Sequence, residues 1–206
     1  MPIRRMPHAA VTMILLLCFA SSAWAESFEK PAQRRTYRER ARGEGVDGLT
    51  MLRIHGGLSA PIGDFSDAYS SGWGLGLSVA HGVSRTVLLS TALGYHRFEH
   101  EVFSDVHASI TPWTFGADVV IPTRSAVRPF VGGGIGLYHV SFSEDIGGAT
   151  VSASENNFGI HMGAGVGGPL SPRTLWGVGV KLHQVWGSDF IDTPFFAFQF
   201  GFGFVL

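Results

Sequence analysis

Charged, imidazole and amide side chains recur at alternate positions in segments that are otherwise rich in glycine. Residues two apart in a β-strand lie on the same face, so these side chains would share one face of each segment. Because an isolated buried ion is strongly disfavoured, we expect them to be paired or hydrogen-bonded in a polar network inside the protein. The expected members are Arg53, His55, His96, Asp118, His161, Lys181, His183 and Gln199.

Arg53 and Asp118 are expected to form an ion pair, since both stand toward the ends of segments that tight turns join. Lys181 and the histidines would extend the network from there. The same groups could instead line a narrow ion-conducting path, and this alternative stays open beside structural packing.

His107 and Ser109 are the one sequence that suggests nucleophilic catalysis. Two residues apart on a strand, they would share a face, where the histidine could act as the base that activates the hydroxyl. The chain has nine histidines, however, so a His-x-Ser sequence arises readily by chance. We interpret the pair as polar residues close to a loop and predict no catalytic residue.

His96 and His100, with Glu99 and Glu101 beside them, could suggest a metal site. Histidines four residues apart meet on a helix, but the local pattern here is strand and loop. A solvated surface cluster is the better interpretation, and no metal or other cofactor is predicted.

These residues stand in a chain that reads, from residue 49 onward, as eight segments of alternating large apolar and small or polar side chains. Turn-forming residues bound each segment. The expected strands are 50–61, 72–83, 86–98, 107–121, 127–142, 156–168, 174–187 and 194–206. Short connections alternate with longer polar ones, which are expected around 64–71, 99–106, 143–155 and 188–193.

The last segment shows most plainly which face is which. One face carries Phe196, Phe198, Phe200, Phe202, Phe204 and Leu206, and the residues between them are mostly small or polar. Such a strand suits a barrel whose large apolar side chains meet lipid. The opposite face, with its small and polar side chains, is here called the lean face and would line a crowded interior. A soluble lipocalin would bury its large apolar residues inside the barrel, so that fold is rejected.

Composition agrees with a membrane barrel. Apolar residues make up 45% of the chain and charged residues 15%, and 28 of the 206 residues are glycine. High apolarity without a spanning helix leaves a closed β-barrel as the membrane fold. A net charge of −1 gives no indication of a nucleic-acid partner.

The first residues predict export. Residues 1–25 combine Arg4 and Arg5, an apolar run over 9–20 and a small-residue cleavage site, as a secretory signal peptide does. The only cysteine, Cys18, lies inside it, so the mature chain would contain no disulfide. Residues 26–48 are dense in charges of both signs and are expected to form a solvated periplasmic tail before the barrel, 49–206.

Aromatic residues are expected where the membrane meets water. Trp176 and Trp186 stand ten residues apart on one face of their strand, a separation of ~25 Å along the membrane normal and close to the height between two aromatic girdles. The predicted girdle residues are Trp73, Trp113, Trp176 and Trp186. Phe65, Tyr69 and Phe190, in acidic loops, are assigned to the same interface in preference to a recognition surface.

Residues 57–65, residues 128–136 and the alternating C-terminal strand resemble the small eight-stranded outer-membrane barrels, the OmpA-type and OmpX-type transmembrane domains. The resemblance covers 49–206 and implies an all-β, eight-stranded antiparallel up-and-down transmembrane barrel in the bacterial outer membrane, with both termini in the periplasm. It also implies outer-membrane lipid, lipopolysaccharide and the barrel-assembly machinery as partners. The C-terminal assembly signal would comprise Phe198, Phe200, Phe202, Phe204 and Leu206. The family's signal usually ends on Phe or Trp, so Leu206 departs from the pattern and could make insertion less efficient.

The leading expectation is a non-enzymatic barrel with a structural role in the envelope and a lumen filled by side chains. The main alternative is a surface adhesin or ligand-binding barrel that acts through its extracellular loops. A narrow channel and a lipid A deacylase are further alternatives. The deacylase would use His107 and Ser109, although in that family the pair lies near the C-terminal end.

Overall fold

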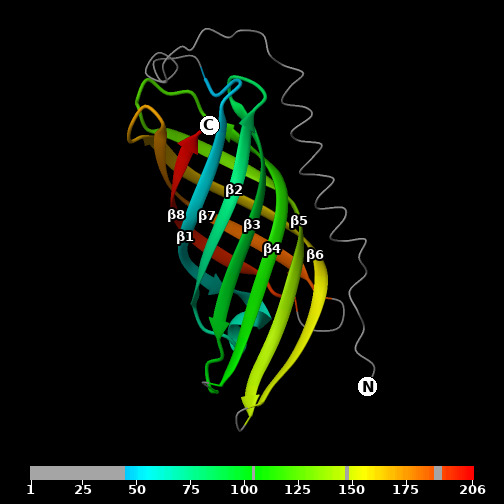
Figure 1. Cartoon of the computed structure of the whole chain (residues 1–206). Helices are drawn as coiled ribbons and strands as arrows, with labels where there is room; N and C mark the ends of the chain where they lie inside the picture. The colour runs from blue at the N-terminus through cyan, green and yellow to red at the C-terminus, as the bar shows by residue number, and fades with distance from the viewer. Residues whose placement is uncertain (1–44, 104, 147–148, 188–191) are drawn as a thin grey trace. The chain divides into compact units, whose positions relative to one another are not determined.

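A computed structural model of the chain describes residues 45–103, 105–146, 149–187 and 192–206. The strands are β1 (Thr50–Pro61), β2 (Gly72–Gly82), β3 (Val87–Glu99), β4 (Val106–Val120), β5 (Arg128–Ile146), β6 (Ala149–Pro169), β7 (Thr174–Trp186) and β8 (Phe195–Val205). Each strand is antiparallel to its neighbour in the sequence, and β8 also pairs with β1, so the sheet closes into a barrel (Figure 1). The predicted eight-stranded antiparallel barrel is confirmed.

The two ends of the barrel differ in their connections. We call the end where β1 begins and β8 ends the turn end; its connections are residues 83–86, 121–127 and 170–173. At the opposite, loop end, residues 62–71 contain the short 3-10 helix η1 (Gly63–Asp67), which Figure 1 shows beneath the barrel mouth. Among the described residues, no helix is long and apolar enough to cross a membrane.

The long polar loop expected over 143–155 is instead a continuation of two strands. β5 runs on to Ile146 and β6 starts at Ala149, with Phe142 opposite Ala153 and Ser143 opposite Ser152. A two-stranded extension beyond the barrel wall needs no apolar face, so its sequence lacks the alternation that predicts a strand. The serines and glutamates of this hairpin therefore made it resemble a loop in the sequence.

The outward face of the barrel is apolar on all eight strands. In β2, Trp73, Leu75, Leu77 and Val79 are exposed, whereas the residues between them are buried. On β8 the exposed side chains are Phe198, Phe200, Phe202 and Phe204. Soluble monomers rarely expose so large a continuous apolar surface, whereas the lipid-facing wall of a membrane barrel consists of one.

The loop half of the lumen is closed by a cluster that we call the aromatic plug. Its buried members are Phe65, Tyr69, Phe98, Ala108, Ile110, Tyr138, Val140, Val185, Phe195 and Ala197. η1 carries Phe65 into the barrel, where its ring centroid lies 5.1 Å from that of Phe98 and 5.0 Å from that of Tyr69. The membrane-interface positions expected for Phe65 and Tyr69 are therefore wrong, because the open barrel mouth gives these rings an interior in which to bury their surface. Phe190 lies outside the described residues.

A second apolar cluster lies at the turn end and consists of Val46, Leu49, Met51, Ala80 and Leu88, with Val120, Leu175 and Val205 packed against it. Val46 donates a backbone hydrogen bond to the Arg85 carbonyl. Gly45 and Gly48 adopt φ angles of 80° and 66°, a region that glycine enters without strain. Residues 45–48, expected to end the solvated tail, thus fold onto the barrel. The predicted signal peptide and the rest of the tail lie outside the described residues.

Candidate functional site

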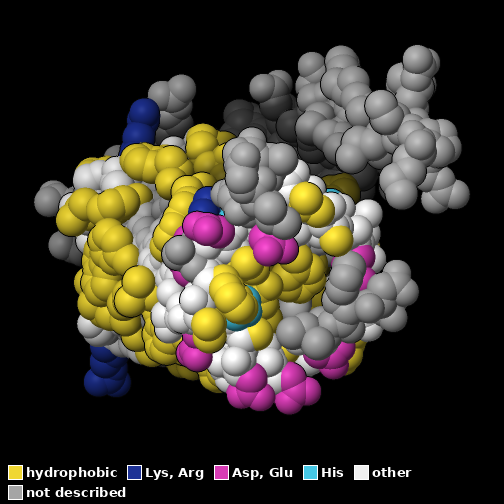
Figure 2. Space-filling view, turned by 90° about the horizontal axis from the view of Figure 1, so that it is seen from below, with side chains coloured by type: hydrophobic (Ala, Val, Ile, Leu, Met, Phe, Trp, Pro, Cys, Tyr) yellow, Lys and Arg dark blue, Asp and Glu magenta, His cyan; other side chains and the backbone are white. Residues whose placement is uncertain are grey.

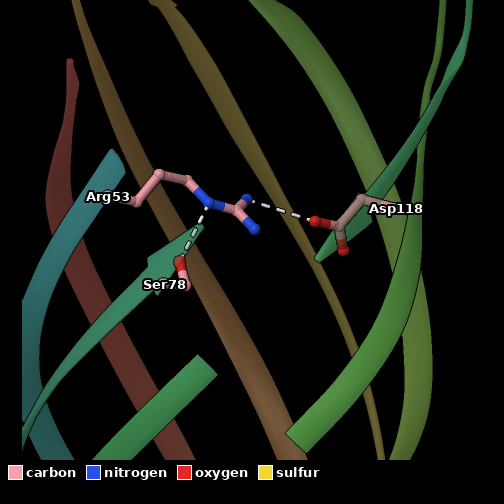
Figure 3. A network of polar contacts seen from close by, with 3 residues as sticks. All are labelled: Arg53, Ser78 and Asp118. Carbon is pink, nitrogen blue, oxygen red and sulfur yellow. Dashed lines mark hydrogen bonds and ion pairs between the residues drawn. The ribbon is translucent and has the colours of Figure 1, made fainter. Parts of the chain in front are cut away.

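Arg53 and Asp118 meet inside the barrel, as the sequence predicts (Figure 3). Arg53 Nη1 lies 3.1 Å from Asp118 Oδ2, and Arg53 Nε donates a hydrogen bond of 3.1 Å to Ser78 Oγ. The three side chains come from β1, β4 and β2. The arginine and aspartate side chains are 28% and 21% exposed, so solvent screens this pair less than a pair on the surface.

Glycines make room for the large side chains of the lumen. A Cβ on Gly132 of β5 would collide with Asp118 Oδ1, and a Cβ on Gly74 would collide with His96 Nδ1. The interior of an eight-stranded barrel is only just wide enough for its own side chains. A long residue on one strand therefore packs over a glycine on the next, which explains the glycine-rich lean faces in the sequence.

A second polar group lies toward the loop end, against the aromatic plug. Ser59 Oγ and His96 Nδ1 are hydrogen-bonded at 2.7 Å, and Tyr138 Oη and His183 Nδ1 at 2.9 Å. The His183 ring stacks on Phe195, with ring centroids 4.6 Å apart and planes 7° from parallel. The single network expected from the sequence is therefore two groups, this one and the ion pair.

His161 lies next to the second group but is not hydrogen-bonded to it. Its ring centroid is 5.8 Å from that of His183. His161 Nδ1 and His183 Nε2 are both buried without a hydrogen-bond partner among the described residues. Buried polar atoms are usually satisfied, so these two leave hydrogen-bonding capacity unused inside the lumen.

The turn half of the lumen contains a cavity of about 230 Å³. The expected network residues that line it are Arg53, His55, Asp118, His161, Lys181 and Gln199. Toward the turn end its lining is mostly apolar, with Val46, Leu49, Met51, Leu88, Val120 and Leu175, and it also includes Arg128. Side chains thus fill the loop half of the lumen, as expected, but the turn half is hollow.

Three partners of the network were missed from the sequence: Ser59, Ser78 and Tyr138. The strand alternation could have identified all three, because each lies on the lumen-facing side of its strand together with residues already assigned to that side. Ser59 follows His55 by four positions on β1. What the strand pattern does not give is the register of β1 with β2 and of β2 with β3, which decides that Ser59 of β1 meets His96 of β3.

Three of the four expected girdle tryptophans lie near strand ends. Trp73 and Trp186 lie at the loop end and Trp176 at the turn end. Trp113 is instead the middle residue of β4, and its Nε1 donates a 3.2 Å hydrogen bond to Thr91 Oγ1. Because that donor finds a partner within the barrel wall, the indole does not depend on the headgroup region for one, and the girdle position expected for Trp113 stays a prediction.

The C-terminal strand presents the expected face to the outside. The exposed residues are Phe198, Phe200, Phe202, Phe204 and Leu206. Gln199, between the first two, lines the lumen cavity. Recognition of this face by an assembly machinery stays a prediction.

His107 and Ser109 lie on β4 close to the loop end, opposite Glu99 and Arg97 of β3. Within the described residues no hydrogen bond joins the imidazole to the hydroxyl. The arrangement therefore fits polar residues close to a loop better than an activated nucleophile.

His96 and His100 do not share a site. His96 faces the lumen and is buried, whereas the His100 ring contacts Tyr69 and Phe103 at the loop end. The surface cluster expected for both is wrong for His96, because the strand alternation turns it inward. Among the described residues, no group of three or more His, Cys, Asp or Glu side chains is placed to hold a metal ion.

The loop end is acidic, as Figure 2 shows from below. Its exposed acidic residues are Asp64, Asp67, Glu99, Glu101, Asp105, Glu144 and Asp192. Arg97 is the only lysine or arginine at this end in the described part of the chain. Val102 and Phe103, in the loop after β3, are 76% and 60% exposed. Beneath this surface, burial raises the pKa of the Tyr69 hydroxyl, which keeps it neutral.

No protein-family model and no curated protein matches the chain. Solved structures do match, among them Neisserial surface protein A, which is 16% identical; the match covers 79% of this chain and 100% of that one, with a TM-score of 0.61. Ail, the attachment invasion locus protein of Yersinia pestis, is 16% identical over 78% of this chain and 99% of its own, with a TM-score of 0.52. The outer membrane protein OprG from Pseudomonas aeruginosa is 15% identical over 79% and 98%, with a TM-score of 0.51. The chain thus has the fold of small outer-membrane β-barrels.

Proposed function

We propose that the protein is an integral, non-enzymatic barrel of the bacterial outer membrane with a structural role in the envelope. The observation that carries this proposal is the apolar outer face on all eight strands, which suits direct contact with membrane lipid and lipopolysaccharide. In this proposal residues 1–25 direct export and are removed. The turn end faces the periplasm and the loop end faces outward, and the face of β8 directs insertion by the assembly machinery.

The aromatic plug supports a structural barrel over a channel. Phe65, Phe98 and Phe195 are fully buried across the loop half of the lumen, so water and ions meet packed apolar rings there. In this proposal the Arg53–Asp118 pair has a structural role and stabilises the wall on the turn side.

Ligand binding at the loop end is the second candidate function, and the exposed Val102 and Phe103 among acidic residues favour it. Apolar anchors ringed by charge are typical of recognition surfaces. Ail has been crystallised with the heparin analogue sucrose octasulfate, a polyanion. The acidic loop end of this chain would repel such a ligand, so a ligand here would be basic.

Deletion and complementation in the native host would test the proposal and separate the two candidates. We expect deletion to admit large antibiotics and detergents that an intact outer membrane excludes, and the wild-type gene to restore the barrier. The Val102→Ser/Phe103→Ser variant should restore it equally, because it changes only exposed loop residues. A barrier that the deletion leaves intact would contradict the structural role; loss of surface attachment, restored by wild type but not by the double variant, would favour ligand binding.

A further inference from the structure

We propose that the cavity in the turn half of the lumen is a binding site for a small organic anion with a short apolar tail. A purely structural barrel needs no such site, so the inference goes beyond the proposed function. It rests on three features of the cavity: its charge, its apolar walls and its closed end.

Cationic side chains outnumber acidic ones in the described lining of the cavity, with Arg53, Arg128 and Lys181 against Asp118. Asp118 already accepts from Arg53, while Lys181 also lines the cavity and interacts with Asp118 only through space. Within the described residues, the Lys181 ammonium has no hydrogen-bond acceptor. A buried ammonium is disfavoured unless it is paired and hydrogen-bonded, so Lys181 offers a pairing position for an anion.

Two further polar side chains line the same cavity, His161 and Gln199. One imidazole nitrogen of His161, Nδ1, is buried without a hydrogen-bond partner among the described residues. A carboxylate has several acceptor positions and could satisfy the ammonium together with one of these groups.

The remaining walls suit an apolar tail. Met51, Leu88, Val120 and Leu175 line the cavity toward the turn end. Lys181 and Leu175 are six residues apart on β7, or ~20 Å along the strand, which leaves length for a tail of several carbons. Cavities of roughly 150 Å³ already hold a benzene-sized molecule, and this one measures about 230 Å³.

The cavity is a pocket with one closed end. On the loop side the aromatic plug fills the lumen, whereas on the turn side the lining includes Ala126 and Pro169, which lie in or beside connections at that end. A ligand would therefore enter from the turn end. Its anionic headgroup would bind at Lys181, and its tail would pack against the apolar cluster at the turn end.

Titration calorimetry of the full barrel in phosphatidylcholine nanodiscs would test this site, with empty nanodiscs as the blank. The probes are octanoate, the neutral octanol and the cationic octyltrimethylammonium, which share a tail and differ in headgroup charge. We expect saturable binding of one octanoate per barrel, and binding of the other two at least about tenfold weaker, because they cannot pair with the ammonium. Absence of octanoate binding, or equal binding of all three probes, would overturn the proposal.

Three variants locate the site. Lys181→Met keeps the length of the side chain and removes the charge, so octanoate should bind at least about tenfold more weakly. Arg173→Met changes an exposed turn-end arginine outside the lining and should leave binding unchanged. Gly203→Leu fills the cavity: a Cβ there meets its nearest atoms at 3.5 Å, so the new side chain has space and should block binding while Lys181 stays.

Heat-modifiable gel mobility confirms that each variant is folded. If Lys181→Met does not fold, Gly203→Leu and the three wild-type titrations still decide the proposal. Octanoate that binds folded Lys181→Met or Gly203→Leu as tightly as wild type would contradict the assigned place of the ligand.

Discussion

The Arg53–Asp118 pair is the interaction that ties the turn half of the wall together across the lumen. The two residues come from β1 and β4, which are not neighbours in the sheet. Ser78 of β2 also accepts a hydrogen bond from the guanidinium. The backbone ladder joins only adjacent strands. The side-chain bridge therefore adds a constraint that pairing alone does not supply.

Asp118→Ala should destabilise the folded barrel by about 1–3 kcal/mol, because it leaves a partly buried guanidinium without its acceptor. Urea unfolding in lipid vesicles, followed by tryptophan fluorescence, would measure the change.

Glu99→Ala is the matched control, since it also removes one carboxylate from an arginine. The Arg97–Glu99 pair is more exposed, at 37% and 48%, and its loss should change the free energy of unfolding by about 1 kcal/mol or less. Equal effects of the two substitutions would mean that the lumen pair contributes no more than a surface pair.

At the scale of the strand, the glycines of the lean faces are not equivalent. A Cβ on Gly159 would lie 2.7 Å from Tyr138 Cε2 and 2.5 Å from the Gln184 carbonyl oxygen, whereas a Cβ on Gly177 would meet only the Val166 carbonyl oxygen at 3.7 Å. Both glycines face inward, on β6 and β7. Alanine substitutions at these two glycines therefore distinguish the packing role of a lumen glycine from the role of its backbone flexibility.

Gly159→Ala should cost about 1–3 kcal/mol of stability by overpacking against Tyr138, while Gly177→Ala should stay within about 0.5 kcal/mol of wild type. The same vesicle unfolding assay measures both. A Gly177→Ala cost as large as that of Gly159→Ala would refute the idea that lumen glycines exist to seat the side chains of the adjacent strand.

Alternation made the strands and their faces predictable. Residues 50–61 are predicted and observed as β1 with the same bounds. The inward placement of Arg53 and Asp118 followed from the alternation of side chains between the two faces of a strand. Their meeting could be predicted because both stand near the turn end and few other charges could balance them. Local residue types carry all of this information.

Two elements could not be predicted, each for a physical reason. η1 lies in a polar sequence, and only the closed barrel creates the cavity mouth into which Phe65 turns. The extension of β5 and β6 lacks an apolar face, so no periodicity marks it. The lumen cavity was missed as well, since a void depends on how eight strands close and is not a property of any one of them.

Considered as a whole, the barrel combines an apolar outer wall, a plugged loop half and a hollow turn half. Its described exposed arginines lie at the turn end, at Arg85, Arg124 and Arg173, and its described exposed acids other than Asp47 lie at the loop end. The enclosure of the polar and glycine-rich face follows from the assignment of the large apolar face to the outside. If the large apolar face were in water, a fold that encloses the lean face and its ions and exposes the apolar residues would be disfavoured.

Arginine substitution on the outer wall tests this assignment most directly. Ile135, in the apolar stretch of β5, is 53% exposed, and Val83, in a turn-end connection, is 49% exposed. In lipid vesicles, Ile135→Arg should lower the free energy of unfolding by about 2–4 kcal/mol, whereas Val83→Arg should cost about 0–1 kcal/mol, because only the first places a charge in hydrocarbon. Equal and small costs at both positions would contradict the account, since they would mean that water, not lipid, covers the wall.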